Sequence, residues 1–430
     1  MCYIEHMKTR FFNARILPMD VETALFTGEL HTDGDRIAYV GPGRDPQKNE
    51  TPFDREIDCK RNLLLPGFKN AHAHSAMTFL RSMADDMPLS DWLFQQVFPR
   101  EAQLTPEDVY TLTKLAILEY LTSGITCIAD MYLFRDSMAA ALVDSGFRGC
   151  VMDAVNDFGG GAERTLDEYR RINTLSPLVK CRVSIHGEYT TSLPLIREMA
   201  ELARDLREPM FVHMNETVKE VEECIDRHGK RPFEVLDEQG AFTYGGMAYH
   251  CVHTSPNERD IIKQRGIYVV TCPASNMKLA SGVAPLVEYR NMGIPVAIGT
   301  DGPASNNCLD MFREMFLVTG LQKLRHGADA MDALDVLEMA CSAGAHACGF
   351  PETDCLKAGK LADVVLLDLQ QPNMQPMHNI PKNVVYSGSK QNVALTMVGG
   401  KILYERGSFF IGEEPDSIYE KAAAVLKRMH

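Results

Sequence analysis

His72 and His74 close an apolar stretch of the chain, and one residue separates them. Residues i and i+2 of a β-strand point to the same side, so both imidazoles can reach one metal ion. Three further apolar stretches end in related groups, namely His213, His250 and Asp301. Imidazole nitrogens and a carboxylate are the donors that Zn²⁺ or Fe²⁺ prefers. The sequence therefore predicts a site for one divalent metal ion and metal-assisted hydrolysis.

Glu216 lies three residues after His213 and is a candidate proton carrier. Each candidate also has an ordinary alternative: the histidines as packing or surface residues, Glu216 as an acid at a helix start, and Asp301 in a turn or helix cap. We expect His250 to act from outside the ligand shell, by orienting or polarising the attacking water, rather than as a metal ligand.

Eight short apolar runs recur through the middle of the chain, and helical patterns such as residues 106–122 and 331–348 lie between most of them. The runs are residues 63–72, 124–132, 149–155, 181–187, 209–215, 246–252, 267–273 and 295–301. Alternating strands and helices predict a parallel sheet, and eight such units predict a closed (β/α)8 barrel. An open doubly wound sheet is the alternative. No glycine-rich dinucleotide motif follows the first run.

Both ends of the chain have a different sequence pattern, in which turn residues separate short strand-like runs. They predict one discontinuous β-sandwich domain formed by residues 1–64 and 357–430, around a catalytic barrel of residues 65–356. The residues after Ser417 have the pattern of a terminal helix. In the barrel, catalytic groups are expected at the carboxyl ends of the strands.

The 430 residues carry a net charge of −14, and no dense run of basic residues occurs, so a nucleic-acid partner is not expected. No apolar stretch has the length of a membrane helix, and the first residues lack the apolar core of a signal peptide. The twelve cysteines are scattered singly, which favours reduced core residues over a disulfide framework. These features predict a cytoplasmic protein with no membrane partner.

The chain resembles the amidohydrolase superfamily, and within it the cytosine-deaminase-like aminohydrolases. The segments that carry the resemblance are Pro66-Gly67 before the histidine pair, His213-x-x-Glu216-Thr217, His250-Cys251-Val252-His253, Pro273-Ala274-Ser275-Asn276-Met277-Lys278-Leu279, and Gly299-Thr300-Asp301-Gly302-x-Ala304-Ser305-Asn306-Asn307. The resemblance implies that one metal ion, with zinc preferred over iron, is bound by His72, His74, His213 and Asp301. It also implies catalytic roles for Glu216, His250 and Asp301.

Within that superfamily the chain is most similar to the group that deaminates 5′-methylthioadenosine and S-adenosylhomocysteine. The similarity implies that Trp92 lines the nucleoside pocket and that Glu101 binds the ribose hydroxyls, as charge-assisted hydrogen bonds would allow. It adds His186, Arg164 and Ser305 as substrate contacts. The ordinary alternatives are a core aromatic for Trp92 and a solvated helix-start acid for Glu101.

One position departs from the group's pattern, because Asp153 stands where an arginine is expected. An acid there would repel the carboxylate of a homocysteine moiety and favour an amine or a hydroxyl. We therefore expect a neutral adenosine-like nucleoside to be a better substrate than S-adenosylhomocysteine.

Two other functions remain open from the sequence. The same metal site serves aminohydrolases and chlorohydrolases that act on guanine, cytosine, pterin or triazine rings, and these enzymes need no ribose contact. A non-catalytic scaffold that keeps the barrel is the remote alternative, although every ligand position is filled here. The expected partner is a small nucleoside or base, and a homo-oligomer is a family expectation only.

Overall fold

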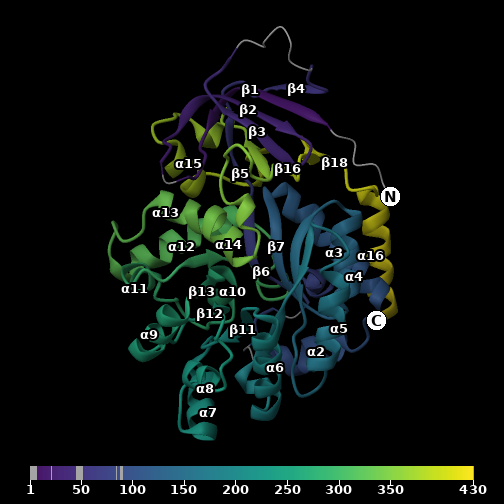
Figure 1. The fold of residues 1–430 in the computed structure, drawn as a ribbon, viewed down its shortest axis with the longest axis vertical. Helices are drawn as coiled ribbons and strands as arrows, with labels where there is room; N and C mark the ends of the chain where they lie inside the picture. The colour runs from purple at the N-terminus through teal and green to yellow at the C-terminus, as the bar shows by residue number, and fades with distance from the viewer. Residues whose placement is uncertain (1–6, 21, 45–51, 84, 88–90, 430) are drawn as a thin grey trace.

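The computed structural model describes residues 7–20, 22–44, 52–83, 85–87 and 91–429. It consists of a (β/α)8 barrel and a smaller β-sandwich domain built from the two ends of the chain. Figure 1 shows the strands from both ends together above the barrel. The predicted fold class is confirmed.

The barrel strands are parallel and reproduce the eight predicted runs. They are β6 (Phe68–Ala73), β7 (Ile125–Met131), β8 (Arg148–Met152), β9 (Val179–Cys181) with β10 (Val183–Gly187), β11 (Met210–Met214), β12 (Gly246–His250), β13 (Ile267–Thr271) and β14 (Val296–Ile298). Strands β6 to β9 pair in one sheet and β10 to β14 in another. Only Arg182 separates β9 from β10, and a parallel bridge between Ala73 and Asp301 joins the first strand to the last.

Helices follow most of the barrel strands. The longer ones are α3 (Pro106–Thr122), α4 (Arg135–Asp144), α5 (Ala162–Ile172), α6 (Leu193–Leu206), α7 (Val218–His228), α9 (Pro256–Arg265) and α12 (Met311–His326), and the shorter ones are α2 (Phe98–Glu101), α8 (Pro232–Glu238), α10 (Pro273–Lys278), α11 (Leu286–Asn291), α13 (Ala333–Glu338) and α14 (Gly344–Ala347). Helix α3 matches its predicted limits because Thr105 and Asp108 form a reciprocal capping box. The predicted helix over residues 331–348 is present as α13 and α14, joined by a π-helical stretch.

The second domain is a nine-stranded sheet in which both ends of the chain pair. Its strands are β1 (Lys8–Ile16), β2 (Phe26–Asp33), β3 (Arg36–Gly41), β4 (Arg55–Asp58), β5 (Leu63–Pro66), β15 (Val364–Leu367), β16 (Val393–Val398), β17 (Lys401–Glu405) and β18 (Ser408–Phe409). Strand β5 pairs with β1 on one side and with β15 on the other. It therefore joins the two ends of the chain into one sheet.

The chain passes from this sheet into the barrel at Gly67. A side chain at this position would lie 2.1 Å from Thr126, so only glycine allows the close approach of the two strands. Helix α15 (Ile380–Tyr386) precedes β16, and the last helix, α16 (Pro415–Met429), packs against α3 of the barrel. The predicted domain limits stay a prediction, although α16 contacts the barrel. None of the helices among the described residues has the length and apolar character needed to cross a membrane.

A buried ion pair links the two domains. The Arg148 guanidinium, at the start of β8, donates two hydrogen bonds to Asp363, from Nε at 2.8 Å and from Nη2 at 3.0 Å. The Asp363 side chain is fully buried and also accepts from the amide of Gly399. Loss of one partner from such a pair leaves an uncompensated charge in the interior.

We predict that Asp363→Asn lowers the free energy of unfolding by about 3–5 kcal/mol, because the Arg148 charge then remains buried without a counterion. Urea unfolding of the two proteins measures the difference. The matched control is Asp136→Asn, which removes an exposed bidentate partner of Arg171 and should cost less than about 1 kcal/mol. Equal losses in both variants would contradict the importance of burial at this junction.

Candidate metal-dependent active site

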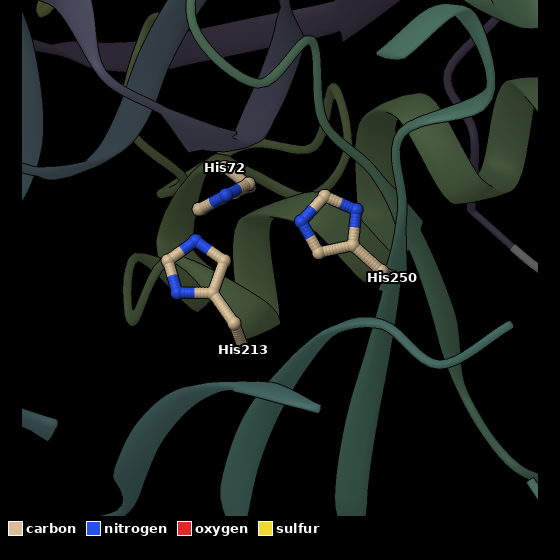
Figure 2. A group of neighbouring side chains, drawn as sticks. All are labelled: His72, His213 and His250. Carbon is tan, nitrogen blue, oxygen red and sulfur yellow. The ribbon is translucent and has the colours of Figure 1, made fainter. Parts of the chain in front are cut away.

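The four predicted metal ligands lie at the carboxyl ends of three barrel strands. His72 belongs to β6 and His74 follows it, His213 lies in β11, and Asp301 follows β14. His72, His74 and Asp301 form one group in which the candidate ligand atoms are all within 4.8 Å of one another. His72, His213 and His250 form a second group under the same limit, and Figure 2 shows their three rings facing one another. The structure thus brings His250 as close to His72 as the expected ligands.

A glycine lets the first and last strands approach closely enough for this arrangement. A side chain at Gly299 would lie 2.7 Å from the Cβ of His72. The amides of Thr300 and Asp301 both donate to the carbonyl of His72. On its other side the His72 ring stacks on Tyr249, with 3.7 Å between the ring centroids. The backbone and one aromatic face therefore fix His72.

Main-chain carbonyl groups orient two of the other imidazoles. The Nδ1 atom of His74 lies 2.5 Å from the carbonyl oxygen of Met131, and Nδ1 of His213 lies 2.7 Å from that of His186. A nitrogen that donates to a carbonyl carries the proton, so the Nε2 atom of each ring has a free lone pair. This is the tautomer that a metal site requires.

Asp301 has hydrogen-bond donors on both carboxylate oxygens. Its Oδ2 accepts from Ser275 at 2.6 Å and from Ser305 at 2.9 Å, while Oδ1 accepts from the Gly302 amide. Although burial acts in the opposite direction, the neighbouring histidines, His74 first among them, hold the pKa of Asp301 well below its usual value. Ser305, predicted to contact the substrate, turns back to Asp301 instead and does not line the cavity described below. The short turn after Asp301 causes this difference.

The donor set fits a divalent cation. His72 is completely buried, and neither of its ring nitrogens has a hydrogen-bond partner among the described residues. Burial holds the pKa of His72 and of His213 well below the usual value, so both rings are neutral ligands at physiological pH. A buried imidazole without a partner is costly unless another group coordinates it. Neutral nitrogens beside an ionised carboxylate are the donors of borderline-soft divalent metals.

Glu216 and His250 lie side by side at the edge of this cluster. One Glu216 oxygen accepts from Ser281 at 3.2 Å, and the other lies 3.8 Å from Nε2 of His250. Burial raises the pKa of Glu216, so its carboxyl group can hold a proton closer to neutral pH. Nδ1 of His250 lies 2.8 Å from the amide oxygen of Asn276, which leaves Nε2 facing the centre of the site.

A cavity of about 440 Å³ opens over the cluster, within the range of small-molecule sites. The predicted residues Trp92, Glu101 and His186 line it, together with Glu216. The Trp92 indole nitrogen and one Glu101 oxygen are buried without a hydrogen-bond partner among the described residues. A hydroxyl-rich ligand would satisfy both atoms.

Two residues of the cavity wall were missed by the sequence analysis. Tyr132 follows the carboxyl end of β7 and lies beside Glu101, whose charge adds to burial in raising the pKa of the Tyr132 phenol well above its usual value. Tyr189 follows β10, and its ring packs edge-on against His186. Both lie directly beyond a barrel strand, where polar groups are expected to gather. This position just after a predicted strand was the feature of the sequence that could have identified both residues.

The far end of the cavity carries balanced charges. Asp153 and Arg164 line it, and the fully buried Arg135 lies behind them, 3.4 Å from Asp153 and in direct contact with Glu168. Arg164 is half exposed and also donates to Glu168 at 3.0 Å. Burial raises the pKa of Asp153. The predicted repulsive acid is therefore compensated, because Arg135 supplies a counter-charge that the sequence pattern had not indicated.

Comparison with known proteins places this geometry in a family. Residues 63–403 match the model of the amidohydrolase family. A 5-methylthioadenosine/S-adenosylhomocysteine deaminase from Thermoanaerobacter pseudethanolicus is 37% identical over 91% of this chain and 93% of its own length. The enzyme of the same name from Desulfovibrio desulfuricans is 42% identical over 88% of this chain and 87% of its own.

Solved structures agree with that assignment. An adenosine deaminase from Xanthomonas campestris with bound zinc has a TM-score of 0.92 and 31% identity, and each chain covers 98% of the other. A guanine deaminase from C. acetobutylicum has a TM-score of 0.82 over 92% of this chain and all of its own, but at 22% identity it shows the fold alone. The chain therefore belongs to the amidohydrolase family, whose model spans most of its length.

Proposed function

We propose that this protein is a metal-dependent aminohydrolase that converts the 6-amino group of an adenosine derivative into a carbonyl and releases ammonia. The observation that carries the proposal is the pairing of two features in one cavity. A cluster suited to a divalent metal lies beside a buried carboxyl, Glu216, and the unpartnered polar atoms of Trp92 and Glu101 lie in the wall. The names of the relatives agree with such a substrate.

We assign His72, His74, His213 and Asp301 as ligands of one ion and favour zinc over iron, as in the relative from Xanthomonas campestris. When bound, the metal would lower the pKa of its water, so that a hydroxide nucleophile is available near neutral pH. His250 can complete the shell or orient that water, because its Nε2 atom faces the same centre.

The chain's own groups move the protons. The Asp301 carboxylate is ionised and can accept a proton from the attacking water. Glu216 is held by Ser281 beside His250 and can donate a proton to the ring nitrogen next to the attacked carbon. Glu216 is then ionised, so it can take up the second proton of the attacking water and pass it to the departing amine, while the C–N bond breaks and the carbonyl forms. Burial of Glu216 keeps water from competing for these steps.

The other end of the nucleoside contacts Glu101 and Trp92. A carboxylate can accept hydrogen bonds from two vicinal hydroxyls, and such charge-assisted bonds are the strong ones. The indole N–H group of Trp92 can donate a hydrogen bond to the ligand. A ring without ribose would leave both groups unsatisfied, which disfavours guanine, cytosine, pterin and triazine substrates.

Ammonia release from the zinc-loaded protein tests the proposal. The substrates are adenosine, 5′-methylthioadenosine, S-adenosylhomocysteine, guanine and cytosine, and zinc is counted per chain by metal analysis. We expect one metal ion per chain and turnover of the nucleosides. Turnover of a free base alone would keep the metal hydrolase but reject the ribose site, and turnover of none of them would reject the assignment.

Asp301→Asn should lower kcat by at least about 10³-fold, because the amide cannot accept the water proton. Since this variant can also lose metal, Glu216→Gln is the companion variant: it leaves every assigned ligand intact and should lower kcat by about 10²–10⁴-fold. Steady-state kinetics with metal analysis of each preparation gives the result. Near-wild-type kcat in either metal-loaded variant would refute the assigned proton transfers.

Glu101→Gln should raise KM for nucleosides by about tenfold or more while changing kcat little, because a neutral amide binds ribose hydroxyls less strongly than a carboxylate. Glu107→Gln is the matched control, because Glu107 is a nearby exposed acid at the start of α3. KM is measured for adenosine and for 2′,3′-dideoxyadenosine. An equal change for both substrates would show that Glu101 does not bind the hydroxyls.

A further inference from the structure

The segment from Pro273 to Ser281 contains helix α10 and the turn after it, and the proposed chemistry uses only Ser281, which holds Glu216. Three of its side chains each contact a different group of the active site: Ser275 contacts Asp301, Asn276 contacts His250, and Ser281 contacts Glu216. Its one cationic side chain, Lys278, is outside the residues that line the active-site cavity. The role of Lys278 must therefore differ from direct substrate contact.

The Lys278 ammonium joins two other loops. It donates to carboxylate oxygen Oδ1 of Asp85, to the amide oxygen of Asn307, and at 3.1 Å to the carbonyl of Ala304. Its side chain and that of Asp85 are both partly buried. We call Lys278, Asp85 and Asn307 the tether.

The two joined loops carry the two halves of the site. Asp85 belongs to the loop after β6 that leads to Trp92 and Glu101, and Asn307 belongs to the loop after β14 that contains Asp301. The same Asn307 side chain donates to Ser82 at 3.3 Å. Hydrogen bonds to charged groups are the stronger class. Lys278 is therefore a strong polar link between the ribose contacts and the metal ligands, beside Arg81, whose guanidinium donates to the carbonyl of Asn307 at 2.5 Å.

Packing supplies part of this link, because Trp92, Leu93 and Val97 belong to the main hydrophobic core. A second cavity, of about 670 Å³, lies between the Trp92 loop and α7, lined by Asp86, Asp91 and Lys278 and by Lys219 and Glu223 of α7. Four residues line both cavities and form the wall between them: Leu93, Phe94, Tyr189 and Leu279. Side chains that border an open cavity make fewer dispersion contacts than enclosed ones. The position of this wall then depends on the polar contacts at its edge.

We propose that Lys278 is a positioning residue. It fixes the Trp92–Glu101 side of the cavity relative to the loop that contains Asp301. Nucleoside affinity then depends on an ammonium group that touches neither substrate nor metal. The effect on substrate rests on the proposed function, whereas the effect on the loop does not.

Trp92 reports on the loop directly, because it is the only tryptophan of the chain. In Lys278→Met and in Asp85→Ala, acrylamide should quench the Trp92 fluorescence more strongly than in the wild type, without any substrate present. Both variants should raise KM for the nucleoside by about tenfold, the effect of one lost charge-assisted hydrogen bond, and leave kcat and metal content nearly unchanged. A merely destabilised protein would instead lose metal and kcat as well.

Lys219→Met is the matched control. Lys219 lines the same second cavity, but it is exposed and pairs with Glu223 of its own helix, so its loss should change neither quenching nor KM. Thermal unfolding checks that each variant is folded, and Asp85→Ala decides the question if Lys278→Met is not. Unchanged quenching and unchanged KM in the folded tether variants would overturn the proposal. A wild type inactive on every nucleoside would reject the proposed function, while the quenching comparison would still decide the tether.

Discussion

The contact between the first and last barrel strands is the constraint on which the site depends. Gly299 brings β14 against His72, and the Ala73–Asp301 bridge closes the barrel. Asp301 therefore reaches the same centre as residues that lie more than two hundred positions earlier in the chain. A side chain at Gly299 would separate the strands and pull the carboxylate from the histidines. The contact that closes the barrel therefore also brings the candidate metal ligands together.

Bringing four imidazoles and two carboxylates into one buried volume is unfavourable without compensation, because each loses hydration. The surrounding groups reduce that cost in two ways. Backbone carbonyls accept from His74 and His213, while two serine hydroxyls and an amide donate to Asp301. His72 alone keeps both ring nitrogens without a partner among the described residues, which leaves it to be satisfied by coordination. The network is therefore complete only in the metal-bound protein.

The sequence was sufficient to predict the features that follow from local periodic patterns. It was not sufficient to predict contacts between distant loops. Eight apolar runs, and the helical pattern that begins with Pro106-Glu107-Asp108, were sufficient for the barrel and for α3, because strand length and helix-start signals are local properties. The burial of Arg135 behind Asp153 and the link from Lys278 to Asp85 depend on contacts between segments that are far apart in the sequence. Such contacts have no period in the sequence. The second domain was predictable from matching strand patterns at both ends, but the packing of α16 on α3 was not.

The two ends of the cavity are supported by different kinds of structure, which has a consequence for how the site can change. The cluster of candidate metal ligands lies on strands and on the first residues beyond them, where main-chain carbonyls orient His74 and His213 and serine hydroxyls hold Asp301. Trp92 and Glu101 lie in short helical segments and Arg164 in the first turn of α5, and charged contacts help to hold Arg164 and the loop before Trp92. A substitution at Asp153 or Lys278 can therefore alter the nucleoside end without disturbing the ligands.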